Sequence, residues 1–198
     1  MNMEKNNTQS DEGQKASQRR LLWTVLIINF AFFIIEMTTG LISKSMGLVA
    51  DSLDMLADAF VYGISLLAVG GTVLMKKNTA KLAGILQFIL AIAGFTEVIR
   101  RFTGVETIPD FRMMIIVSSF SVIANGICLY LLNKSKSSEA HMKASIIFTS
   151  NDVLINFGVI AAGILVLVFQ SNIPDLIIGT IVFLIVIKAA IKIYRLGK

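Results

Sequence analysis

The sequence has little charge, few helix-breaking residues, and almost no cysteine or histidine. Only 16% of its 198 residues are charged, whereas soluble domains carry roughly 25%, so an ordinary water-soluble globule is excluded. Fourteen Gly and two Pro are too few for a fibrous or low-complexity chain. The only cysteine, Cys128, cannot form an intramolecular disulfide. The only histidine, His141, is a weak candidate for a metal-entry ligand.

Apolar runs of membrane length take up most of the chain, as a mean hydropathy of +0.76 indicates. A transmembrane helix needs about 20 mostly apolar residues. Six runs meet this need: 21–42, 46–75, 82–99, 113–132, 144–169 and 173–194. The sequence therefore predicts an all-α integral membrane protein, with six transmembrane helices in one bundle over residues 21–198. Residues 1–20 are polar and predict a disordered cytosolic tail.

Lys and Arg are distributed unevenly over the segments between these runs. With six spans, 14 of the 18 basic residues fall on the side that holds both termini. Because cytosolic segments carry the excess of Lys and Arg, both termini are expected in the cytosol, with the plasma membrane as the expected location. This bias also explains the net charge of +5, so the expected partner is the lipid bilayer and not a nucleic acid.

Three carboxylates lie within eight residues of the second apolar run. Asp51, Asp54 and Asp58 have the spacing i, i+3, i+7, which puts them on one face of a helix. Burying a carboxylate in a bilayer costs about 2.5 kcal/mol or more, so acids at such positions indicate a function.

Two further runs contribute polar side chains. They are Asn29 and Glu36 in the first run, and Asn151, Asp152 and Asn156 in the fifth. At 1.5 Å per residue, Asp58 lies about 18 Å below the outer membrane face and Asp152 about 12 Å above the inner one. In a core of about 30 Å these depths coincide. The sequence thus predicts that Asp54, Asp58, Asp152 and Asn156 surround one point.

Such a cluster must be neutralised by protons or by a cation, because neighbouring carboxylates repel one another at low polarity. The alternative is pairing with Lys or Arg, for which Lys188 is the one deep candidate. Asp51 is either a pathway residue or a hydrogen-bonding partner near the outer mouth. Glu36 either lines the pathway or holds the first helix against the second.

The run from Glu36 through Gly40, Ser45 and Leu48 to the three aspartates resembles the helix 1–helix 2 signature of cation diffusion facilitators. The segment NDVLINFGVIAAG is similar to the fifth helix of that family, with Asp152 at its second metal ligand. The resemblance implies a six-helix carrier that exports Zn²⁺ or a related ion in exchange for H⁺, usually as a homodimer. The sequence departs from the pattern of that family at three points. Phe148 occupies the first ligand position of helix 5, a C-terminal cytosolic domain is not expected, and the segment 134–143 is not rich in His.

These observations lead to the prediction of a divalent-cation efflux carrier of the Zn, Co, Mn or Fe class, operating by metal/proton antiport. It is expected to be neither an enzyme nor dependent on a cofactor. The expected ligands are Asp54, Asp58, Asp152 and Asn156, or water in place of Asn156. The expected pathway and supporting residues are Glu36, Asp51, Asn29, Asn151 and Phe148.

Two alternatives belong to other functional classes. A membrane subunit that binds metal without transporting it, or that pairs with a longer carrier, fits the same acids. An intramembrane aspartyl protease needs its two aspartates in motifs such as GxGD or YD, and neither motif is present. For Phe148, two interpretations stay open. It either faces the site, which then offers only oxygen ligands and discriminates less strongly for Zn²⁺, or it is ordinary packing.

Overall fold

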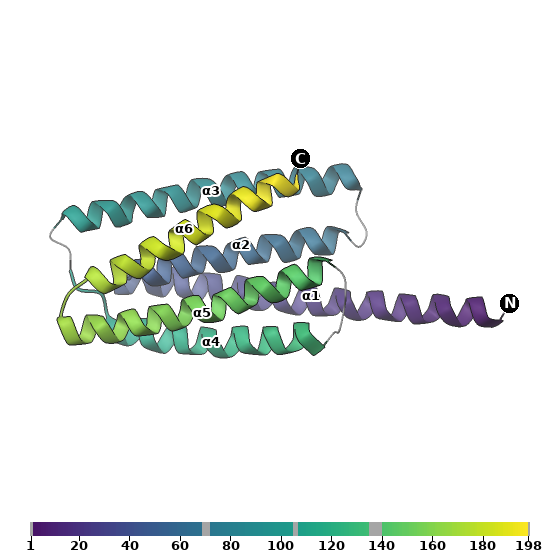
Figure 1. The fold of residues 1–198 in the computed structure, drawn as a ribbon, viewed down its shortest axis with the longest axis horizontal. Helices are drawn as coiled ribbons and strands as arrows, with labels where there is room; N and C mark the ends of the chain where they lie inside the picture. Colours follow the sequence, from purple (N-terminus) through teal and green to yellow (C-terminus); the bar gives the residue numbers. More distant parts are fainter. Residues whose placement is uncertain (1, 69–71, 105–106, 135–139, 198) are drawn as a thin grey trace.

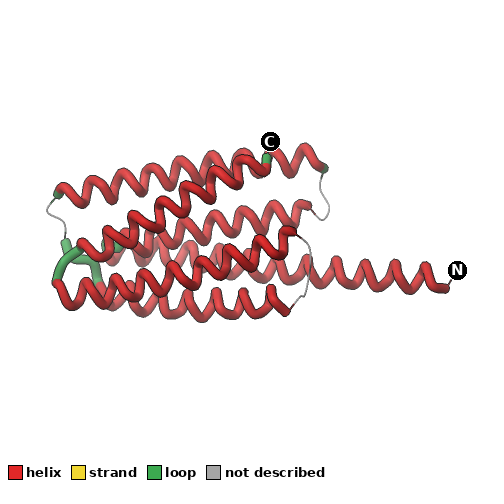
Figure 2. The backbone as a smooth tube through the Cα atoms, in the orientation of Figure 1, coloured by secondary structure: helices red, strands yellow, loops and turns green. Residues whose placement is uncertain are grey.

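The fold is known from a computed structural model that describes residues 2–68, 72–104, 107–134 and 140–197. Within these ranges, the side chains of 2–12, 14–15, 68, 73, 75–76, 79, 140–145 and 147–148 are not described. The described residues form six α-helices and no strand (Figures 1 and 2). The helices are α1 (Asn2–Ser43), α2 (Met46–Ala68), α3 (Val73–Thr103), α4 (Phe111–Lys134), α5 (Ala140–Phe169) and α6 (Ile173–Leu196).

The helices run alternately up and down, so the N-terminal extension of α1 and the end of α6 lie at the same end of the bundle (Figure 1). We call this the terminal end. The opposite end holds the α1–α2, α3–α4 and α5–α6 connections. Arg100, Arg101 and Arg112 belong to helix ends on that opposite side. The arrangement agrees with an even number of membrane crossings.

Five helices are long and apolar enough to cross a membrane: α1 from Ala16, α3 from Ala80, α4, α5 from Thr149, and α6. The sixth, α2, carries the three aspartates and does not qualify by composition. Its 23 residues span about 34 Å, and it contacts all five other helices. Because α2 is surrounded by apolar helices, its acids do not face lipid. The prediction of an all-α membrane bundle is confirmed.

The surface of the bundle is apolar, and its interior contains the polar groups. Large side chains such as Ile42, Phe120 and Leu154 are more than 60% exposed, whereas Glu36 and Asp51 are fully buried. This is the reverse of a soluble protein, in which charged residues are almost never fully buried. The outer surface of the bundle is therefore suited to contact with lipid and not with water.

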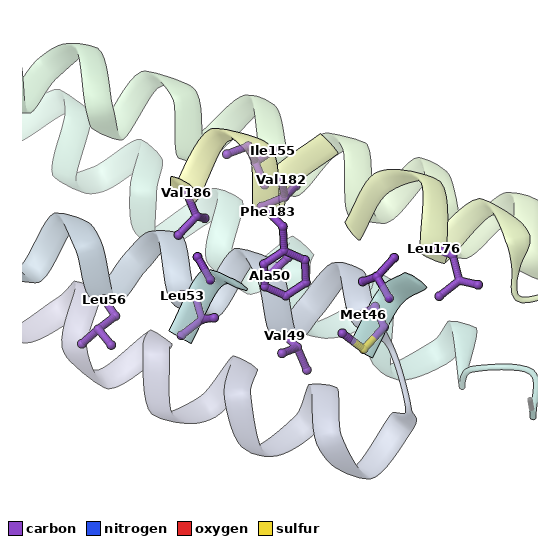
Figure 3. Packing of buried hydrophobic residues seen from close by; sticks show 12 residues of the cluster. Met46, Val49, Ala50, Leu53, Leu56, Ile155, Leu176, Val182, Phe183 and Val186 are labelled. Carbon is purple, nitrogen blue, oxygen red and sulfur yellow. The ribbon is translucent and has the colours of Figure 1, made fainter. Parts of the chain in front are cut away.

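The two faces of α2 differ in what they pack against. Val49, Ala50 and Leu53 lie in an apolar cluster with Phe183 and Val186 of α6 (Figure 3). The aspartates are spaced so that they point away from this contact, toward α1, α4 and α5. The apolar contact with α6 thus sets the rotation of α2 that turns its acids into the bundle.

Two predicted boundaries were wrong. Helix α2 ends at Ala68 and not at residue 75, and α3 begins at Val73, so Lys76 and Lys77 belong to the start of α3 rather than to a loop.

The predicted disordered tail is the second difference, since α1 begins at Asn2 and continues through residues 2–20. About half of the residues in this segment are Glu, Gln, Lys or Arg, which favour helix. The apolar part of α1 supplies a helix that is already nucleated, and each further residue then adds one hydrogen bond.

Candidate functional site

The site is built around the acidic face of α2 and one aspartate of α5. Asp54, Asp58 and Asp152 are 5%, 3% and 1% exposed. The carboxyl group of Asp152 lies close enough to those of Asp54 and Asp58 for their charges to interact. Two antiparallel helices therefore bring the three acids to one level of the bundle, as the depth argument predicts.

A hydroxyl pair adjoins this group on the side of the terminal end. The Tyr62 hydroxyl donates to Asp58 Oδ2 at 3.1 Å and lies 2.7 Å from Thr149 Oγ1. Both residues are fully buried. The helix spacing accounts for the contact, because Tyr62 follows Asp58 by four residues and Thr149 precedes Asp152 by three. The two hydroxyls link α2 to α5 next to the acids.

A second pair of carboxyl groups lies toward the opposite end of the bundle. Glu36 of α1 and Asp51 of α2 lie close enough for their charges to interact, and Ser121 of α4 donates its hydroxyl to Glu36 Oε1. Neither oxygen of Asp51 has a hydrogen-bond partner in the described part of the chain. Asp51 and Glu36 thus extend the line of buried acids beyond Asp54.

The predicted asparagines fall into two groups. Asn156 is fully buried, and its Nδ2 donates to the backbone oxygen of Asp152 at 3.0 Å. Its Oδ1 has no hydrogen-bond partner among the described residues. Asn29 is also buried, with Nδ2 bonded to Val25 O at 2.9 Å.

Asn151, by contrast, is exposed, so the structure does not bring it to the acids, and its supporting role stays a prediction. One residue corresponds to a turn of about 100° around the helix, which carries Asn151 off the face that holds Asp152. Phe148 lies in α5 one turn before Asp152, but its side chain is outside the described residues.

Among the described residues, no basic side chain forms an ion pair with the buried acids. In the described part of the chain, the ion pairs join Glu97 to Arg100 and Arg101 at the end of α3. None involves the three clustered aspartates, which disagrees with the alternative of pairing with Lys or Arg. Among the described residues, no three Asp, Glu, His or Cys side chains are arranged so that they could hold a metal ion as they stand.

The comparison with known families supplies the decisive observation. Residues 22–197 match the family model described as the cation efflux transmembrane domain. The chain belongs to the cation efflux family. This membership makes it a multi-pass membrane protein of a family that transports cations, and a transporter rather than an enzyme. A search of curated proteins found no match.

Several buried polar residues of this cation efflux protein were missed by the sequence reasoning. Tyr62 continues the spacing of Asp51, Asp54 and Asp58 by one more turn, and this periodicity could have identified it. The span 113–132 lacks charge almost entirely, yet one face of it is polar and buried. That face carries Ser118, Ser121 and Asn125 at i, i+3 and i+7.

Proposed function

We propose that this protein exports a divalent cation of the Zn, Co, Mn or Fe class in exchange for protons. Asp54, Asp58 and Asp152 are the cation ligands in this proposal, and Asn156 Oδ1 or water completes the site. The observation that carries it is the burial of Asp152 close to Asp54 and Asp58 in the bundle interior, with no ion pair to any of them among the described residues.

Proton coupling follows from the repulsion between these buried carboxyl groups. Buried carboxylates that lie this close together repel one another, so the group must take up protons or a cation. A cation that enters needs deprotonated ligands and therefore displaces protons. The carboxyl groups must also turn toward a common centre, because no three of the described acids now enclose one. The site consequently holds either protons or a cation, and alternation between the two is antiport.

The remaining parts of the proposal concern the environment of the carrier. Most Lys and Arg residues belong to segments at the terminal end of the bundle. This excess supports the proposal that both termini face the cytosol and that the carrier lies in the plasma membrane. A homodimer is proposed for the assembled carrier on the basis of the family resemblance.

Flux measurements in proteoliposomes test the proposal. The purified protein is reconstituted, and uptake of Zn²⁺, Co²⁺ and Mn²⁺ is measured with and without an imposed pH gradient. We expect cation uptake that accelerates with an opposing proton gradient. Asp58→Asn and Asp152→Asn should reduce uptake to that of empty liposomes, whereas Glu97→Gln, at the end of α3, should retain it.

Two results would contradict the proposal. If a correctly inserted Asp152→Asn variant takes up the cation as fast as the wild type, Asp152 is not a ligand. Stoichiometric Zn²⁺ binding by a wild-type protein that catalyses no flux would favour the non-transporting subunit instead.

A further inference from the structure

We infer that Tyr62 is a positioning residue for the cation site, and that it acts on Asp58 through a hydroxyl chain completed by Thr149. The inference rests on the proposed role of Asp58 as a cation ligand. It adds two residues that bear no charge and that lie on the terminal side of the acids.

The directions of the two hydrogen bonds follow from the number of protons available. The Tyr62 hydroxyl has one proton, which it donates to Asp58 Oδ2 over 3.1 Å. The 2.7 Å contact between Tyr62 and Thr149 must then be made with the proton of Thr149. The hydrogen bonds therefore run from Thr149 to Tyr62 and from Tyr62 to Asp58. The Tyr62 hydroxyl is both acceptor and donor in this chain, whereas the Thr149 hydroxyl is the donor at its start.

The surroundings explain why a hydroxyl is needed at this point. Tyr62 packs in an apolar cluster with Leu22, Val25, Cys128 and Leu132, all fully buried. A carboxylate oxygen that faced such a cluster without a hydrogen bond would be strongly destabilised. The Tyr62 hydroxyl satisfies Asp58 Oδ2 there and leaves Oδ1 as the oxygen that can turn to a cation.

The ring of Tyr62 also fixes where the hydroxyl sits. It is the largest of the fully buried side chains, and its hydroxyl reaches α5 at Thr149, one turn from Asp152. The same chain thus sets the distance between the helices that supply Asp58 and Asp152. Groups that orient metal ligands in this way typically change metal affinity by about 10- to 100-fold when they are removed.

The test uses variants that remove one hydroxyl at a time. Zn²⁺ is the probe, with flux into proteoliposomes and equilibrium binding to the purified protein measured for each variant. Tyr62→Phe should raise the Zn²⁺ concentration for half-maximal flux, and the dissociation constant, by about 10- to 100-fold, with the maximal rate changed much less. Thr149→Val should act in the same direction, whereas Thr149→Ser, which keeps the hydroxyl, should resemble the wild type.

The double variant and a matched control make the result specific. Because Thr149 acts only through Tyr62, Tyr62→Phe combined with Thr149→Val should be no worse than Tyr62→Phe alone. Tyr130 is 63% exposed on α4, and Tyr130→Phe should leave Zn²⁺ affinity unchanged. If Tyr62→Phe does not fold, the Zn²⁺ affinities of Thr149→Val and Thr149→Ser still test whether the hydroxyl chain positions Asp58.

Two outcomes would overturn the inference while leaving the proposed function intact. One is wild-type Zn²⁺ affinity in Tyr62→Phe, under conditions in which Asp58→Asn abolishes flux. The other is an equal loss in the Val and Ser variants, which would reduce Thr149 to a packing role. A wild-type protein that neither binds nor transports Zn²⁺ would instead contradict the proposed function and this inference together.

Discussion

Asp175 of α6 caps the start of α2, and its removal should destabilise the bundle strongly. Its carboxylate accepts three hydrogen bonds, from Ser45 Oγ at 2.6 Å, from the Met46 N–H at 2.6 Å and from the Gly47 N–H at 3.0 Å. Ser45 Oγ accepts in turn from the Leu48 N–H at 3.1 Å. Asp175 is 1% exposed, so water cannot replace it.

The magnitude follows from the two backbone groups that Asp175→Ala would leave unpaired. A buried donor without a partner costs about 1–3 kcal/mol, so the free energy of unfolding should fall by roughly 2–6 kcal/mol. In a chain of this length, 1 kcal/mol corresponds to about 2–4 °C in Tm. A decrease near 10 °C is therefore expected, as an order of magnitude. Asp175→Asn keeps one acceptor oxygen and should lie between the wild type and Asp175→Ala.

The single cysteine provides the assay. Cys128 is fully buried, so a thiol-reactive fluorogenic dye reports the temperature at which the bundle opens. Asp110→Ala is the matched control. Asp110 Oδ1 accepts from the Arg112 N–H at 2.9 Å at the start of α4, but Asp110 is exposed, so water can take its place. Equal Tm values for the alanine variants of Asp175 and Asp110 would refute the argument that burial makes the Asp175 cap strong.

Three further predictions concern packing, topology and selectivity. A Cβ on Gly84 would lie 2.5 Å from the α6 backbone, so Gly84→Ala should lower Tm by several degrees, whereas Gly126→Ala, with nothing within 4 Å, should not. Cysteines at the exposed positions Ser17 and Leu196 should resist an impermeant maleimide in intact cells and react after lysis; labelling of intact cells would reverse the topology. Phe148→His should shift competition flux toward Zn²⁺ over Mn²⁺, and an unchanged ratio in an active variant would place Phe148 outside the site.

The sequence predicted the class of fold and the convergence of the acids because both depend on local patterns. Membrane-length apolar runs indicate spanning helices whatever their neighbours are. The spacing of Asp51, Asp54 and Asp58 assigns them to one face without knowledge of the partner helix. The depth of Asp152 follows from the rise per residue, which is why its position close to Asp58 could be expected.

Only the tertiary structure decided which side chains complete the acidic groups. Asn151 and Asn156 are equally polar in the sequence, yet the packing of α5 exposes the first and buries the second. Likewise, nothing in the sequence distinguishes Asp175 from an acid at the membrane interface. Its contacts with Ser45 and Met46 join segments about 130 residues apart.

The difference between the two kinds of information is physical. Hydropathy and helix periodicity are properties of a single segment, whereas hydrogen bonds such as that of Tyr62 with Thr149, 87 residues away, depend on how two helices are rotated against each other. That rotation is set by the interlocking of apolar side chains, here between α2 and α6 (Figure 3). The sequence by itself therefore determined which helices span the membrane and which acids lie within them, and packing determined which uncharged partners those acids have.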